Sequence, residues 1–172
     1  RPVIEAVSPF QIEVARPSTP QALRDTLPHA AYGQAQVLAS PLKMARVASA
    51  IAAGGTVVPA RWVVGEAPGA DAGTPWLAPA DAARLARDMR EVVTSGTGRV
   101  LAGNATPMAG KTGTAEVDRR PAHSWFVGFA PYGGSRRIAF AVLIEHAGYG
   151  GRTAAPIAGD IVDAARALGY FR

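Results

Sequence analysis

The fold and the chemistry of this chain are best deduced from AGKTGTAEV, residues 109–117. Its β-branched residues Thr112, Thr114 and Val117 are interleaved with small residues, a pattern typical of an extended strand. One lysine and two threonine hydroxyl groups therefore fall within a single short strand. We expect Lys111 to Thr114 to lie at an accessible edge of a β-sheet.

The letters Gly-Lys-Thr also occur in phosphate-binding loops, which sets up a competing hypothesis. Such a loop needs a first glycine followed by four residues before Gly-Lys-Ser/Thr, and a helix that begins at the lysine. The position of that first glycine is held here by Ala105, and Gly103 comes too early. The extended pattern after Lys111 also contradicts a helix, so the sequence does not predict a nucleotide site.

Composition narrows the class of protein further. The 172 residues suffice for one domain with a real core. Each apolar run is shorter than the roughly 18 residues of a transmembrane helix. The net charge of +5 comes with scattered basic residues, all but two of them arginine, which does not indicate a nucleic-acid partner. The chain begins without methionine or a signal peptide, from which we expect a preceding segment.

Metal and thiol chemistry are not predicted. The chain has no cysteine, which excludes disulfides, thiol catalysis and thiolate zinc sites. Its three histidines show no metal-ligand spacing. We expect no metal and no cofactor.

The chain divides into an irregular arm, residues 1–33, and a domain portion, residues 34–172. Five prolines interrupt the arm, which has one alternating run, residues 10–14, suited to an edge strand. Residues 56–64 are expected to be extended, followed by a loop up to Thr74. Helices are predicted from Pro41 to the Gly54-Gly55 stop, from about residue 79 to 95, and from 154 or 155 to about 168.

Three strands are predicted at 107–117, 123–130 and 136–146. Short links favour antiparallel pairing of consecutive strands, so the fold class is α+β, a three-stranded antiparallel meander flanked by helices. The last strand is apolar on both faces and needs cover on both. Three helices are too few to cover both faces of this strand. We therefore expect further covering elements outside the chain.

Several landmarks occur around this strand in a fixed order, and together they resemble a known family. They are Tyr32-Gly33-Gln34, the helix from Ser40 to Gly55, Val92–Thr97, Ser124–Pro131 and Ala154–Ala158. With the Lys-Thr-Gly triplet they resemble the C-terminal part of penicillin-binding transpeptidases, more closely the monofunctional, class B-like enzymes. The resemblance covers most of the chain after Tyr32. A Ser-x-Asn motif is missing, because the one asparagine, Asn104, follows Ala102-Gly103.

The resemblance implies roles for four residues. Lys111 and Thr114 would be catalytic, with the Thr114 N–H donating to the oxyanion beside the N–H of a serine that lies elsewhere. Thr112, Gly113 and Thr114 would bind substrate: the two hydroxyls hold its carboxylate, and Gly113 leaves room for a peptide along the strand. Lys111 adds positive charge beside that anion.

The implied parent is a D-Ala-D-Ala transpeptidase that cross-links peptidoglycan stem peptides by serine acyl transfer and binds β-lactams. The chain alone should be inactive without the nucleophile-bearing N-terminal part of the same protein. The expected location is the extracytoplasmic face of the membrane, reached through an N-terminal anchor outside this sequence. Two alternatives stay open: a serine β-lactamase or D,D-carboxypeptidase fragment, and a non-catalytic module that binds β-lactams or a partner.

Ser40-Pro41-Leu42-Lys43 is a literal Ser-x-x-Lys at a helix start and is a rival nucleophile. We interpret Ser40 as a helix N-cap instead. Its neighbours resemble the later helix of the family, and no second motif separates Lys43 from Lys111.

Overall fold

The computed structural model describes residues 13–14, 19–34, 37–58 and 73–171. Its elements follow the order β1 (Glu13–Val14), α1 (Pro20–Ala30), β2 (Val37–Leu38), α2 (Pro41–Ala52), β3 (Thr56–Val57), β4 (Thr74–Pro75), α3 (Pro79–Thr94), η2 (Arg99–Leu101), β5 (Ala109–Val117), β6 (Arg120–Ala130), β7 (Ile138–Ile144) and α4 (Ala154–Ala167). The predicted α+β class is confirmed.

The central sheet is the antiparallel meander β5-β6-β7. Its register pairs Thr112 with Phe126 and Phe126 with Val142. The β5-β6 turn is tighter than predicted, since Val117 pairs with Arg120 and β6 already begins there. A positive φ of 55° at Arg119 and a register shift between Ala115 and Val117 accommodate this turn.

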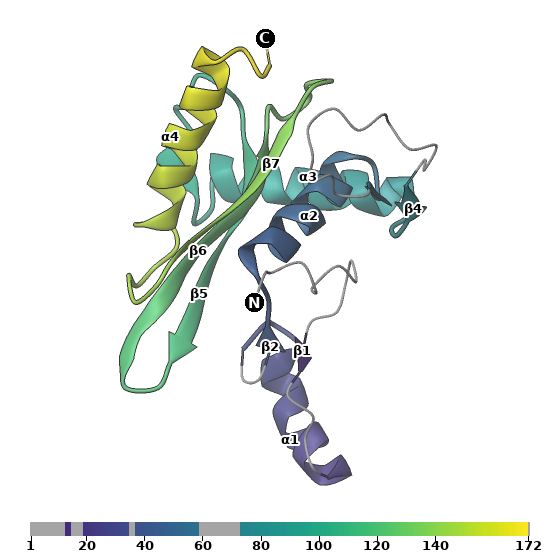
Figure 1. Ribbon diagram of the computed structural model, residues 1–172, viewed down its shortest axis with the longest axis vertical. Helices are drawn as coiled ribbons and strands as arrows, with labels where there is room; N and C mark the ends of the chain where they lie inside the picture. Colours follow the sequence, from purple (N-terminus) through teal and green to yellow (C-terminus); the bar gives the residue numbers. More distant parts are fainter. Residues whose placement is uncertain (1–12, 15–18, 35–36, 59–72, 172) are drawn as a thin grey trace, which may run out of the picture.

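Helices cover both faces of the sheet, with α4 on one side and α2 and α3 on the other (Figure 1). On the α4 side, Phe126, Phe140 and Val142 form a core with small residues of the helix, among them Ala158. On the other side, Ile51 of α2 packs against Ala109 and Phe129.

The expectation that three helices are too few to cover the last strand stays a prediction, because five of the seven residues of β7 are only partly buried. Every residue of β7 is buried or partly buried. The alanines of α4 let its backbone approach the sheet closely over Phe140 and Val142, the two buried residues of β7. Large apolar side chains are exposed elsewhere, for example Leu168 and Tyr170 after α4 and Tyr149 before it.

The N-terminal arm is more regular than predicted. Residues 20–30 form α1, which Figure 1 shows beside β1 and β2, away from the main sheet. Local side-chain bonds support the helix: Gln21 Nε2 donates to Asp25 Oδ1 at 2.8 Å. Pro20 is the first residue of the helix, and Pro28 lies in its last turns. Because proline usually interrupts a helix, the sequence did not predict one here. The predicted edge strand is described only at Glu13–Val14, which pairs with β2.

The other extended segment predicted, residues 56–64, is described as β3 over Thr56–Val57. It pairs with β4, a short strand that begins at Thr74, where the expected loop ends. Residues 59–64 lie outside the described part of the chain.

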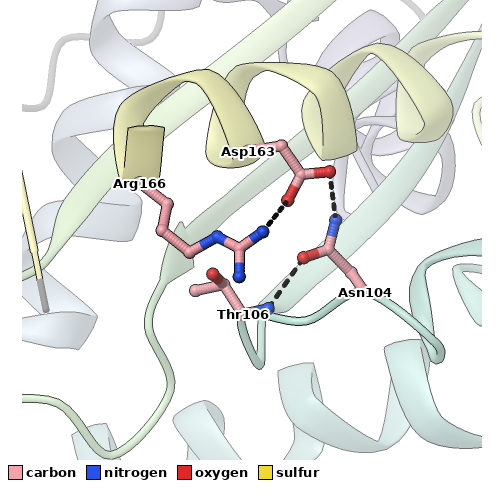
Figure 2. Close-up of polar contacts among 4 residues, drawn as sticks. All are labelled: Asn104, Thr106, Asp163 and Arg166. Carbon is pink, nitrogen blue, oxygen red and sulfur yellow. Dashed lines mark hydrogen bonds and ion pairs between the residues drawn. The ribbon is translucent and has the colours of Figure 1, made fainter. Parts of the chain in front are cut away.

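The loop that leads into β5 is tied down by polar side chains. Asn104 Oδ1 accepts from the N–H of Thr106 at 2.9 Å, and its Nδ2 donates to Asp163 of α4 at 3.3 Å (Figure 2). From the other side, Arg90 of α3 donates to the carbonyl of Met108 at 2.7 Å. These bonds connect the start of β5 to helices on both faces of the sheet.

Candidate active site

The Lys-Thr-Gly-Thr segment lies in β5, which is an edge strand. β5 pairs with β6 on one side, and no strand among the described residues pairs with its other edge. This placement agrees with the expected accessible edge. The residues predicted to be catalytic and substrate-binding, Lys111 to Thr114, are therefore contiguous on a strand whose outer backbone groups face away from the sheet.

Three hydrogen bonds identify which backbone groups face outward. Gln34 Nε2 donates to the Thr114 carbonyl at 3.1 Å, the Glu116 N–H donates to Gln34 Oε1 at 3.3 Å, and Lys111 Nζ donates to the Thr112 carbonyl at 2.6 Å. In a strand, the N–H and C=O of one residue point to the same edge, and alternate residues repeat that direction. The N–H groups of Thr112 and Thr114 therefore also face the free edge.

The side chains of the segment divide between the two faces of the sheet. Thr112 stands opposite Phe126, whose ring belongs to the core under α4. Lys111 is exposed and alternates to the opposite face, the face that α2 and α3 cover. The ammonium group of Lys111 then turns back to the strand edge, where it places positive charge next to the outward N–H groups.

The hydroxyl of Thr112 is already engaged. It lies 2.5 Å from the hydroxyl of Thr97, in the segment after α3, and Thr112 is only 8% exposed. A bond of this kind holds the Thr112 side chain in one rotamer. Thr97 had been recognised only as part of a family landmark, and nothing local in the sequence links it to position 112.

Gly113 is enclosed by neighbours on both faces. A Cβ at this position would lie 3.0 Å from Cβ of Trp125, its partner in β6. On the other face, a Cβ at Gly150 would come within 2.5 Å of the Gly113 carbonyl oxygen and 2.3 Å of the Trp125 carbonyl oxygen. The loop before α4 therefore packs directly on the backbone of the triplet. Gly113 gives room to Trp125 as well as to the substrate expected from sequence.

Ser40 acts as the N-cap of α2, as predicted. Its Oγ accepts from the Lys43 N–H at 3.2 Å. The helix it caps packs on β6 and β7. This interaction accounts for Ser40 without a catalytic role.

No group of three or more potential metal ligands occurs among the described residues. Within the same part of the chain, no helix is both long and apolar enough to span a membrane.

Comparison with known proteins identifies the family. The model of the penicillin binding protein transpeptidase domain matches residues 15–163. The chain belongs to this family. The resemblance drawn from the ordered landmarks is confirmed, and so is the fold class that it implied.

Curated relatives of this transpeptidase family include peptidoglycan D,D-transpeptidase PbpA of Mycobacterium tuberculosis, 34% identical, with 77% of this chain and 30% of that protein covered. MrdA of Haemophilus influenzae, also a peptidoglycan D,D-transpeptidase, is 34% identical over 54% of this chain and 17% of its own. The chain thus spans less than a third of the length of these relatives.

Among solved structures, the imipenem acyl-enzyme of penicillin-binding protein A from M. tuberculosis is similar, with a TM-score of 0.69 and 30% identity. The alignment covers 91% of this chain and 36% of that one. The fold is therefore that of the corresponding part of a penicillin-binding transpeptidase.

Proposed function

We propose that this chain supplies the substrate-binding strand and part of the oxyanion hole of a serine D,D-transpeptidase that cross-links peptidoglycan stem peptides. The relatives named as peptidoglycan D,D-transpeptidases support this assignment. The observation that carries it is the edge position of Lys111–Thr114, with backbone N–H groups directed away from the sheet. The nucleophilic serine belongs to a segment outside these 172 residues.

In the proposed reaction, the serine oxygen attacks the carbonyl carbon of the penultimate D-Ala residue. Its proton passes to the nitrogen of the terminal D-Ala, which leaves as an amine when the peptide bond breaks. The tetrahedral oxyanion accepts hydrogen bonds from the Thr114 N–H and from the N–H of the serine. One such donor is worth about 3 kcal/mol of transition-state stabilisation. An amino group of a second stem peptide then attacks the acyl-enzyme carbonyl. The ester bond to the serine breaks, and a proton from the amine returns to the serine oxygen as the cross-link forms.

Lys111 and the threonines orient the donor. The Lys111 ammonium lies at the strand edge, 2.6 Å from the Thr112 carbonyl, where it attracts the terminal carboxylate of the donor. The Thr114 hydroxyl lies on the same strand and holds that carboxylate. We assign the Thr112 hydroxyl to the same role, with Thr97 fixing its direction.

β-Lactams are the second proposed ligand class. Solved complexes of the M. tuberculosis relative are acyl-enzymes of imipenem and of penicillin G. The carboxylate and reactive carbonyl of a β-lactam would use the same groups as a stem peptide. Because peptidoglycan lies outside the cytoplasmic membrane, we place the reaction there, with any membrane anchor N-terminal to these residues.

The test is acylation by labelled penicillin in the complete transpeptidase that carries this chain. Lys111→Ala and Gly113→Val should each slow acylation at least about tenfold, by loss of charge and by displacement of the strand. Lys43→Ala, the other lysine of the chain, is the matched control and should react normally. Normal labelling of both β5 variants would refute the assignment, and loss of labelling in Lys43→Ala would move the nucleophile to Ser40.

A further inference from the structure

Gln34 contributes a side chain from outside β5 that contacts the outer edge of the proposed substrate strand. It lies 80 residues away from Thr114 in sequence, and yet its single amide group makes two bonds to β5. Nε2 donates to the Thr114 carbonyl at 3.1 Å and Oε1 accepts from the Glu116 N–H at 3.3 Å. One partner needs a donor and the other needs an acceptor, so only one orientation of the amide satisfies both.

The backbone of Gln34 is held in place by the end of α1. The N–H of Gly33 donates to the Ala30 carbonyl at 3.1 Å, and the N–H of Gln34 donates to the His29 carbonyl at 3.0 Å. Gly33 has a φ of 84°. These two bonds and the positive φ define a Schellman ending, which suits glycine at this position. Gln34 thus starts from a fixed point, and it is partly buried.

The position of the Gln34 amide matters because of how a donor must pair with β5. In antiparallel pairing, two residues directly opposite each other exchange both of their N–H···O=C bonds. A donor residue whose carbonyl oxygen accepts from the Thr114 N–H therefore directs its own N–H at the Thr114 carbonyl. The Gln34 Nε2 group already donates to that oxygen.

The bond to Glu116 shows that Gln34 also occupies the next backbone group of β5 that a donor would use. The Glu116 N–H is the next outward donor along β5, and it would pair with a carbonyl two residues before the reactive one in the donor. Gln34 Oε1 already accepts from it. One side chain thus fills both backbone positions that follow the oxyanion position.

Building on the proposed transpeptidase function, we propose that Gln34 is an internal occupant of the acyl-donor subsite. A donor that carries an N–H on the carbon next to its reactive carbonyl displaces the Gln34 amide from Thr114 and Glu116. A donor without that N–H leaves Gln34 in place. Gln34 therefore determines how the site discriminates between the two kinds of donor.

Two β-lactams separate these cases. Benzylpenicillin has an acylamino N–H on the carbon beside its reactive carbonyl, whereas imipenem has a hydroxyethyl group there. In the complete transpeptidase, Gln34→Met keeps an unbranched side chain and removes both bonds to β5. We expect the ratio of the acylation rate with benzylpenicillin to that with imipenem to rise about 3- to 10-fold. This factor corresponds to the free energy of one neutral hydrogen bond.

Gln21→Met is the matched control. Gln21 is an exposed glutamine on α1 whose amide bonds to Asp25, so the same change there leaves β5 untouched. The ratio of the two acylation rates should stay at the wild-type value. Gln34→Glu adds a second variant, because an ionised carboxylate still accepts from Glu116 but repels the Thr114 carbonyl. It should raise the ratio as well.

Hydrogen–deuterium exchange in the wild-type protein gives a readout independent of any variant's folding. The Glu116 amide should exchange faster after acylation by benzylpenicillin and should not change after acylation by imipenem. An unchanged rate ratio in Gln34→Met, or equal slowing of both β-lactams, would overturn the proposal and make Gln34 a structural brace. Failure of both β-lactams to acylate the wild-type protein would instead refute the proposed function, and the inference with it.

Discussion

The contact between Gly150 and the triplet strand gives a prediction whose size follows from the structure. A Cβ at Gly150 would lie 2.3 Å from the Trp125 carbonyl oxygen, 2.5 Å from the Gly113 carbonyl oxygen and 2.9 Å from the Gly113 nitrogen. All three are backbone atoms, which do not rotate out of the way as a side chain does. In Gly150→Ala, the loop must move by about 1 Å to reach ordinary contact distance.

Overpacking of this kind typically costs about 1–3 kcal/mol. Two of the three contacted atoms belong to Gly113, which lies in the proposed substrate strand. Acylation by penicillin should therefore also slow down. We expect Gly150→Ala in the complete transpeptidase to lose about 1–3 kcal/mol of stability, seen as a lower Tm in thermal unfolding, and to acylate more slowly with labelled penicillin.

Gly103→Ala is the matched control. A Cβ at Gly103 meets no atom within 4 Å, so this variant should unfold within about 0.5 kcal/mol of wild type. A Gly150→Ala protein with unchanged Tm and unchanged acylation would show that the loop does not rest on β5. The reasoning about Gly113 would then fail.

Three further predictions follow from contacts around the strand. Thr97→Val removes the hydroxyl that Thr112 contacts and should lower stability by about 1–3 kcal/mol, because the remaining hydroxyl is buried; chemical unfolding measures this. Asn104→Ala removes two hydrogen bonds, one to Asp163, and should cost about 1–3 kcal/mol in the same assay. The isolated chain, lacking a nucleophile, should form no covalent penicillin adduct in intact-mass spectrometry, and an adduct mapped to Ser40 would contradict this.

Two control variants sharpen the unfolding predictions. Thr94→Val removes an exposed hydroxyl that bonds only to carbonyls of its own helix, so it should change stability much less than Thr97→Val. Arg166→Ala removes an exposed ion pair of 4.0 Å with Asp163, worth at most about 1 kcal/mol. Equal effects of a control and its partner would refute the corresponding argument.

Sequence reasoning located the elements whose signals are local. The N-cap at Ser40, the stop at Gly54-Gly55 and the short links between strands predicted α2 and the meander correctly. The helix α1 could not be predicted in the same way, because prolines lie at its start and in its last turns.

The site divides in the same way. Lys111 to Thr114 could be found because they are contiguous and belong to a known motif. Three residues reach that motif only through the tertiary fold: Gln34, Thr97 and Gly150. The hydrogen bonds that Thr97 and Gln34 make to β5 join residues 15 to 82 positions apart in sequence. A single sequence holds no physical signal for such pairs, since neither spacing nor periodicity relates them.

Under the proposed function, the structure of β5 has a consequence for resistance to β-lactams. The outward peptide groups of β5 offer the same atoms to the natural donor and to an inhibitor, and no side-chain exchange removes a peptide group. Substitutions that spare the natural reaction while excluding a β-lactam should therefore arise around the strand rather than on it. The surroundings described here, the end of α1 and the loop before α4, are where selection under antibiotic pressure has side chains to alter.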